Sequence, residues 1–205
     1  MTGIVPIRIA VLLFWILGVT GGFAVVLNFQ SGDGLVGTAP ELWPPGTKLA
    51  LDHERKTLIM FAHPKCPCTR ASIEELNRLL ARCSDRVTAQ VWFFQPGGFP
   101  SEWAKGDLWR SAAAIPGVSV HEDFDGTSAR RFGAETSGHV LLYDTQGHLL
   151  FRGGITGGRA HAGDNAGVSA IFSLVVGQKP GLSRSPVYGC SLLGECEASP
   201  GRVSR

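Results

Sequence analysis

The sequence has no long run of basic residues and no visible internal repeat. Its 205 residues carry 19 Lys and Arg against 17 Asp and Glu, so the formal net charge is only +2. A nucleic acid is therefore not an expected partner. A nucleotide is not expected either, because the glycine-rich stretch 153–165, GGITGGRAHAGDN, lacks the Lys-Ser/Thr pair that completes a phosphate-binding loop.

Cysteine is also scarce. The five cysteines are too few for a disulfide scaffold and do not form an even set, so each needs its own assignment. They are Cys66, Cys68, Cys83, Cys190 and Cys196. The 44% hydrophobic and 18% charged content is ordinary for a chain that buries a core. Cys83 lies on an expected helix and is predicted to be one of the core residues.

Charge is absent from Ile9 to Leu27, an apolar run about long enough to cross a bilayer. The run ends in FAVVLNF without a small-x-small cleavage site, which favours an uncleaved signal-anchor over a cleaved signal peptide. Residues 1–30 are therefore predicted to cross the inner (cytoplasmic) membrane once. The positive-inside rule keeps Arg8 in the cytoplasm, so the remaining chain is expected in the periplasm, where disulfides can form.

The chain is organised around Thr57–Ser72, TLIMFAHPKCPCTRAS. An apolar run of strand length leads into two cysteines and then into a helical pattern, so Cys66 is predicted as the helix N-cap and Pro67 as the first helical residue. A sulfur at the positive end of a helix favours the thiolate, which makes Cys66 the expected nucleophile. The alternatives are that Cys66 and Cys68 fill a small buried space or bind a structural metal.

The rest of the chain alternates predicted strands and helices between two less regular segments. In order these are a tether and lead-in (31–56), a strand (87–94), a helix capped by Ser101, a strand (118–121), a short helix (124–132), a hairpin (139–144 and 148–152), a helix (166–176) capped by Asp164 or Asn165, and a cysteine-containing tail (181–205). This order predicts an α/β domain over 57–180 with three layers and a mixed central sheet.

The cysteine pair at the head of the first helix makes this plan resemble the thioredoxin fold. The resemblance is closest to membrane-anchored, extracytoplasmic thioredoxin-like proteins of the RedB type. It covers about 57–177 and is carried by HPKCPCTRAS, LLYDTQGHLLFRGGIT, GRAHAGDNAG and PVYGCSLLGEC. It implies redox chemistry at Cys66 and Cys68, acting on protein thiols or disulfides with no required cofactor. The chain departs from thioredoxins in carrying C-x-C for C-x-x-C and Ser137-Gly138-His139 where they have a cis-proline.

Topology predicts which residues meet the cysteines. The strand beginning at His139 should start at the sheet edge where the cysteines lie, and the loop 153–165 should return there. This would bring His139 and His161 near His63. Imidazole and thiolate are ligands for copper and zinc, so a metal-binding or metal-delivery protein is the alternative function. Its predicted ligands are Cys66, Cys68, His63 and His161.

The tail raises a choice between two disulfides. Cys190 and Cys196 can form a local staple, or Cys190 can return to the active site, since the stretch from Gly177 is long enough when extended. A flexible tail carrying Cys190 would then resolve a disulfide with Cys66 or Cys68. The predicted catalytic residues are therefore Cys66, Cys68 and Cys190. A peroxide-reducing enzyme is less favoured because the P-x-x-x-T-x-x-C pattern of peroxiredoxins is absent.

Overall fold

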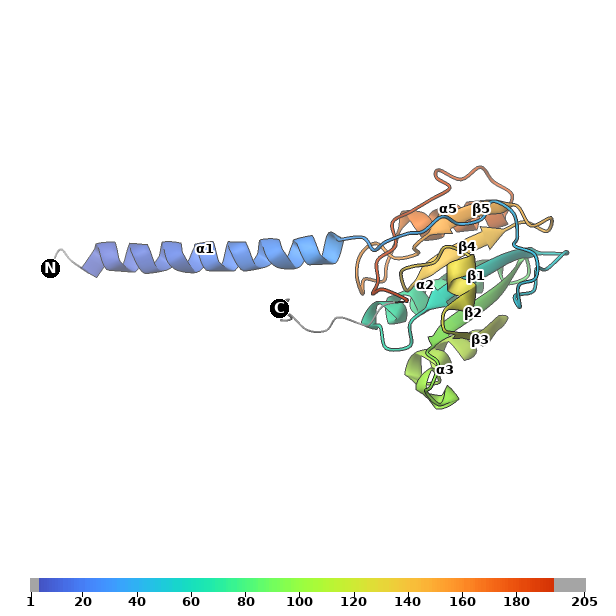
Figure 1. Cartoon of the computed structure of the whole chain (residues 1–205). Coiled ribbons are helices and arrows are strands. Elements are labelled where there is room, and N and C mark those ends of the chain that lie inside the picture. Colours follow the sequence, from blue (N-terminus) through green and yellow to red (C-terminus); the bar gives the residue numbers. More distant parts are fainter. Residues whose placement is uncertain (1–3, 194–205) are drawn as a thin grey trace. The chain divides into compact units, whose positions relative to one another are not determined.

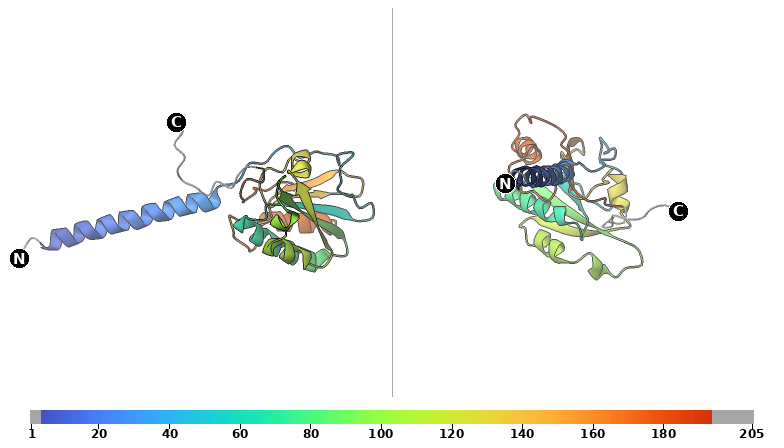
Figure 2. Two further views of the ribbon diagram at one scale, coloured as in Figure 1. Left: turned by 60° about the horizontal axis from the view of Figure 1, so that its bottom comes forward. Right: turned by 90° about the vertical axis from the view of Figure 1, so that its left-hand side faces the viewer.

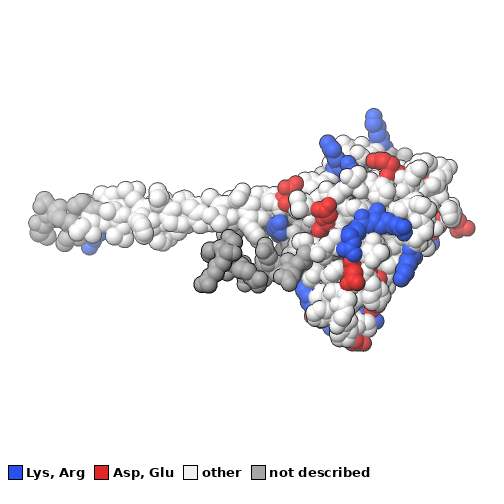
Figure 3. Space-filling view, viewed as in Figure 1, with Lys and Arg blue, Asp and Glu red and all other residues white. Residues whose placement is uncertain are grey.

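The structure, a computed structural model, describes residues 4–193 and divides into two compact units, Met1–Gly32 and Asp33–Arg205. Cys196, and with it the predicted Cys190–Cys196 staple, lies outside the described residues. Helix α1 (Ile4–Ser31) makes up the first unit and contains Ile7–Ser31, which is long and apolar enough to cross a membrane. On the face seen in Figure 3, acidic and basic side chains are absent from most of its length.

The second unit is built on a five-stranded mixed sheet of order β3-β2-β1-β4-β5 (Figure 1). The strands are β1 (Lys56–Ala62), β2 (Val87–Gln95), β3 (Val118–Phe124), β4 (His139–Tyr143) and β5 (Leu149–Gly153). β1, β2 and β3 run parallel, whereas β4 is antiparallel to both β1 and β5. The carboxyl end of the central strand β1 and the start of β4 therefore meet at one edge, as the sequence predicts.

Helices cover both faces of this sheet and give it three layers. On one face lie α2 (Pro67–Cys83), α3 (Asp107–Ala113) and α5 (Ala166–Val175), and on the other lies α4 (Thr127–Arg131) (Figure 2). Alternate residues of β1 enter the two cores: Leu58 and Met60 pack with the first layer, Ile59 and Phe61 with the second. Successive strand side chains point to opposite faces, so a strand between two layers is apolar throughout. The predicted thioredoxin-like three-layer fold is confirmed.

The segment 33–51 is packed on the second face, which corrects its interpretation as a tether. Ala39 is buried, and the Tyr143 hydroxyl donates a hydrogen bond to the Pro40 carbonyl over 2.9 Å. Trp43 contacts the rings of Phe132 and Tyr143 edge to face. Such aromatic contacts stabilise beyond the area they bury, so the segment belongs to the domain.

The C-terminal segment 183–192 is likewise fixed along the edge of the domain, in contrast to the flexible tail expected from the sequence. Its backbone exchanges hydrogen bonds with Arg152 and Gly154 near the end of β5. Further along, Leu192 N donates to Glu135 O over 2.8 Å. These hydrogen bonds join residues about 30 to 57 positions apart, so no local sequence pattern predicts them.

Some predicted element boundaries also differ. Ser101 does not cap a long helix: a short 3₁₀ turn (Ser101–Trp103) comes first, and α3 begins after Gly106. β3 extends to Phe124 because its last residues continue to pair with β2. Of the two predicted caps of α5, Asp164 and Asn165, the structure has Asn165, whose side chain accepts a hydrogen bond from Val168 N at 2.9 Å.

Candidate active site

Cys66 lies where β1 passes into α2. Its backbone is extended (φ −88°, ψ 121°), and Pro67 occupies the first turn, so the predicted N-cap is confirmed. The Cys66 N–H donates to His63 O over 3.1 Å in the connecting turn. Proline is tolerated here because the first helical N–H groups have no partner within the helix. This local geometry places the sulfur at the positive end of α2.

Three sulfurs meet at this point. Cys66 Sγ lies 2.9 Å from Cys190 Sγ, and the Cys190 backbone N–H also approaches Cys66 Sγ at 3.4 Å. The Cys68 thiol hydrogen-bonds to Cys66 from the first turn of the helix. The structure thus brings together the three cysteines predicted to be catalytic, two of them 124 residues apart in the chain.

Cys66 and Cys68 differ in acidity. The hydrogen bond from Cys68 holds the pKa of Cys66 well below its usual range; burial opposes this shift, and hydrogen bonds from Cys190 add to it. The same interaction with Cys66 raises the pKa of Cys68, and burial raises it further. Cys66 is therefore the thiolate of the group and Cys68 remains protonated beside it, since a hydrogen bond to the charged form favours that form.

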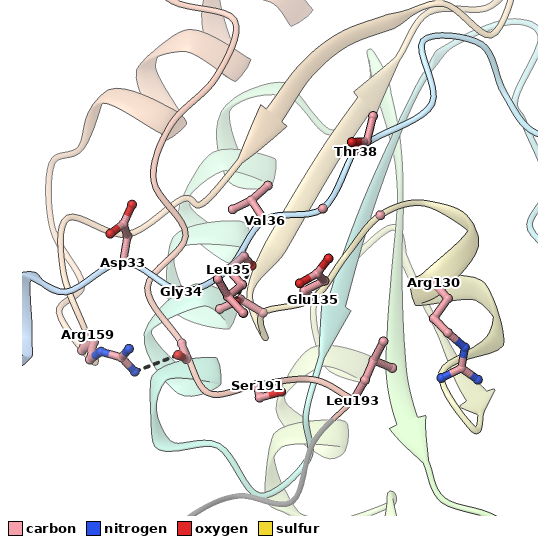
Figure 4. A pocket seen from close by; sticks show the side chains of 14 residues that line it. Asp33, Gly34, Leu35, Val36, Thr38, Arg130, Glu135, Arg159, Ser191 and Leu193 are labelled. Atoms are coloured by element: carbon pink, nitrogen blue, oxygen red, sulfur yellow. Dashed lines mark hydrogen bonds between the residues drawn. The ribbon is translucent and has the colours of Figure 1, made fainter.

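The tail is held over Cys66 by paired backbone. The Ser137 N–H donates to Cys190 O over 2.9 Å, and Ser191 forms an antiparallel bridge with Thr136. An Arg159 guanidinium N–H donates to Gly189 O over 2.7 Å, as Figure 4 shows. Gly189 has to be glycine because a Cβ there would run into the Ser137 carbonyl.

Ser137 stands where thioredoxins have the segment before a cis-proline, and no peptide bond among the described residues is cis. Its hydroxyl accepts a hydrogen bond from His63 N at 2.8 Å and lies 2.7 Å from the hydroxyl of Thr69. Ser137 thus links the end of β1, the first turn of α2 and the tail. This role is not predictable from the sequence, because an isolated serine before a strand has no distinguishing signal.

The glycine-rich loop 153–165 lies beside the cysteines, as topology predicts. The backbone of Ala160 hydrogen-bonds to Cys68 and adopts the left-handed conformation (φ 54°). Glu75, buried on α2, accepts a hydrogen bond from Gly163 N at 2.8 Å and one from Arg78 at 2.7 Å. A glutamate at the same helical spacing as the buried leucines is a readable signal for this anchor.

The three histidines do not form a metal-holding cluster with the sulfurs within residues 4–193, although the charge of Cys66 acts on the nearby His63. His63 is buried against Phe94 and Trp103, and burial lowers its pKa. His139 is fully buried in β4, where neither ring nitrogen has a hydrogen-bond partner within the described part of the chain. His161 is exposed, and its backbone N–H donates to Gly158 O over 3.3 Å within the same loop. Over residues 4–193, no three His, Cys, Asp or Glu side chains are arranged to hold a metal ion.

Two hollows flank the site. A groove of about 790 Å³ runs beside the tail, between residues 33–38 and Glu135, and includes Gly189 and Ser191 (Figure 4). A second, of about 650 Å³, lies between α2 and α3; its lining includes Cys66 and no residue of 183–192. Cys66 nevertheless has 0% of its surface exposed, whereas Cys190 is only partly buried.

Comparisons with known proteins support the fold. No known protein family and no curated protein matches the sequence. Among solved structures, a hypothetical protein from Sinorhizobium meliloti is similar over 80% of this chain and 97% of its own, with 19% identity and a TM-score of 0.56. An uncharacterised conserved protein from Geobacillus kaustophilus is similar over 82% and 94%, with 16% identity and a TM-score of 0.56.

A looser likeness extends to a secreted disulfide oxidoreductase from Mycobacterium tuberculosis. It covers 48% of this chain and 68% of that one, with 17% identity and a TM-score of 0.40. At such low sequence identities the comparisons support the fold alone. The reaction that the site can carry out has to be inferred from the geometry of the cysteines.

Proposed function

We propose that this protein is a membrane-anchored, extracytoplasmic thiol–disulfide oxidoreductase of the RedB type, acting through its Cys-Pro-Cys site and Cys190. The observation that carries the proposal is the 2.9 Å approach of the Cys66 and Cys190 sulfurs at the N-terminus of α2. Thiol–disulfide exchange requires a thiolate in contact with a second sulfur, and both are present.

In this proposal Cys66 and Cys190 form the redox pair. Their oxidation to a disulfide releases two electrons and one proton, because Cys66 is already a thiolate. It requires little movement, because the tail is already held over Cys66. Cys68 stays a thiol and stabilises the Cys66 thiolate in the reduced state. Stabilising the reduced form makes the pair a stronger oxidant. Protein thiols or disulfides are the substrates.

The apolar helix α1 supports the location. It contains one segment that fits a membrane span, and Arg8 at its start favours a periplasmic domain. Labelling of intact cells with a membrane-impermeant thiol reagent, after reduction, tests this topology. Labelling of Cys190 only after permeabilisation would place the domain in the cytoplasm, and N-terminal sequencing of the mature protein tests whether the helix is retained.

The redox pair is tested by peptide mapping of the full chain in detergent, oxidised, acid-quenched and digested. We expect a reversible Cys66–Cys190 disulfide in the native protein. The Cys83→Ala variant is the control and should form it too, because Cys83 lies at the far end of α2. Recovery of only Cys66–Cys68 or Cys190–Cys196 links would contradict the proposal. Metal analysis of the same preparation tests the copper or zinc alternative.

A further inference from the structure

Cys66 and Cys190 differ in their access to solvent. Cys66 has no exposed surface, although it carries the thiolate, whereas Cys190 remains partly exposed. The two sulfurs are in contact, so any disulfide between them has one buried and one partly exposed end. A thiolate of a partner protein attacks a disulfide sulfur along the axis of the S–S bond, so it needs open space beyond that sulfur. A partner protein is far larger than a water molecule, and the buried sulfur of Cys66 leaves it no such space.

The tail itself is what covers Cys66. Cys190 lies across it with both backbone groups turned inward, the N–H toward Cys66 Sγ and the carbonyl toward Ser137 N. Arg159 and Glu135 hold the tail on either side, at Gly189 and Leu192. Uncovering Cys66 would break all of these bonds, whereas Cys190 is already partly exposed while they are in place.

The groove between α2 and α3 is the rival route to Cys66. Its lining includes Lys65, Arg70, Glu74 and Ala160 as well as Cys66. It borders Cys66 without exposing it, because the residue's accessible surface remains 0%. The groove therefore has to open before a partner sulfur can use it.

We propose that the partner protein forms its mixed disulfide with Cys190. Cys66 is then the buried sulfur that is released from Cys190 when the partner attacks and that attacks Cys190 again to re-form the disulfide. This inference rests on the proposed function. It reverses the roles expected from the sequence, where Cys66 attacks the partner and Cys190 resolves. Cys190 is the sulfur that touches the substrate, and the Cys66 thiolate acts on the partner only through it.

The chemistry balances in both directions. A partner thiolate attacks Cys190 Sγ, the Cys66–Cys190 bond breaks, and its electron pair leaves on Cys66. A second partner thiolate then attacks the partner sulfur, releasing Cys190, which takes a proton; the partner is oxidised and the pair reduced. Cys66 is the better leaving group because its thiolate is stabilised by hydrogen bonds.

In the reverse reaction Cys190 attacks a partner disulfide, and its proton passes to the Cys66 thiolate 2.9 Å away. The expelled partner sulfur takes that proton from Cys66. The restored Cys66 thiolate then attacks Cys190 Sγ and releases the second partner sulfur as a thiolate. The same mixed disulfide, on Cys190, is thus an intermediate in both directions.

The test uses glutathione and glutathione disulfide as probes on the full chain in detergent. The oxidised native protein is treated with glutathione, quenched in acid and mapped, and we expect the adduct on Cys190. The Cys66→Ser variant, treated with glutathione disulfide, should accumulate a stable Cys190 adduct because the returning thiolate is missing. In Cys190→Ser the tail still covers Cys66. Glutathione disulfide should therefore modify Cys66 in this variant at least about tenfold more slowly than it modifies Cys190 in Cys66→Ser. Cys196→Ser, in both assays, controls for reaction at the tail's other cysteine.

A major adduct on Cys66 in the native protein, equal adducts on both sulfurs, or no Cys190 adduct in Cys66→Ser would overturn the inference. Mapping of the native protein needs no variant, so a misfolded mutant cannot mask the outcome. Failure to form any Cys66–Cys190 disulfide would instead contradict the proposed function. The two failures are therefore distinguishable.

Discussion

Cys66 and Cys83 stand at opposite ends of helix α2 and are both buried, yet their thiols have opposite acidity. The pKa of Cys66 is lowered by its hydrogen bonds with Cys68 and Cys190. The pKa of Cys83 is raised by burial, and its thiol donates to Leu79 O over 3.2 Å, one turn back. Burial alone favours the neutral thiol, so donors aimed at the sulfur decide which cysteine becomes a thiolate. The end of the helix acts in the same direction, since its N-terminus favours negative charge.

The largest expected difference between the two cysteines is in activity. Cys66→Ser should reduce complete turnover of disulfide exchange to the rate in buffer, because the serine hydroxyl cannot replace the thiolate and the reaction stops at the Cys190 adduct. Cys83→Ala should leave the rate unchanged and cost about 1–2 kcal/mol of stability through the lost buried sulfur. Exchange assays and thermal unfolding of both variants check this. A loss of activity in Cys83→Ala with unchanged folding would break the comparison.

His139 tests the effect of burial on a group whose ring nitrogens have no hydrogen-bond partner among residues 4–193. Burial lowers its pKa to about 4, and the charge of Arg152 adds to the effect. The unfolded chain therefore binds the proton first, so stability is full above about pH 6.5 and falls as the pH drops toward 4. The shift corresponds to about 3 kcal/mol at the acid end of this window.

We expect His139→Leu to flatten this part of the stability–pH curve, measured by thermal unfolding from pH 7 to about pH 4. His161→Gln, which alters an exposed loop histidine, serves as the control and should keep the native slope. An unchanged slope in His139→Leu would mean that the acid sensitivity arises elsewhere.

Cys68 tests the donor half of the comparison. Cys68→Ala removes a hydrogen bond to the thiolate and should raise the pKa of Cys66 by about one to two units, the equivalent of a hydrogen bond to a charged group. Cys68→Ser keeps a donor at this position and should raise it less. The ultraviolet absorbance of the thiolate, titrated in the reduced protein, gives the pKa directly. Equal shifts in both variants would mean that Cys68 acts through packing.

The sign of the pH effect follows from the same pKa. A lowered folded pKa means that Cys66 stabilises the reduced protein fully above its unfolded pKa, and that this stabilisation is lost as the pH falls through the folded value. Cys68→Ala should therefore lose part of the stability that the reduced native protein has at neutral pH. The oxidised protein, which has no thiolate, should lose little.

The smallest expected effect concerns the cover over Cys66. Arg159→Gln removes a hydrogen bond to Gly189 O and should speed alkylation of Cys66 by iodoacetamide about two- to tenfold, the factor for a net hydrogen bond of about 0.5–1.4 kcal/mol. Arg131→Gln is the matched control, because Arg131 also donates to a backbone carbonyl, Gly46 O, away from the tail. Mass spectrometry of the Cys66 peptide gives both rates. No change in Arg159→Gln would mean that the tail is held without this contact.

Local sequence was sufficient for much of the scaffold. The apolar run of β1, the proline after Cys66 and the asparagine before α5 each act within a few residues, through strand propensity or capping. Hence the central strand, the start of α2 and the cap of α5 were predicted correctly. Ser101 was misjudged because its capping signal competes with Gly106, which interrupts the helical pattern five residues later.

The sequence by itself determined that Cys66 would stand at a helix N-terminus and that an apolar helix would begin the chain, because both depend on neighbouring residues. Only the tertiary structure decided which sulfur meets Cys66 and which one a partner can reach. Cys190 is brought there by backbone pairing with Ser137 and by Arg159, contacts that span 30 or more residues and leave no periodicity or composition to detect. The burial of Cys66 likewise arises only when the layers and the tail are assembled. The sequence therefore predicted the position of the thiolate but not that the tail covers it.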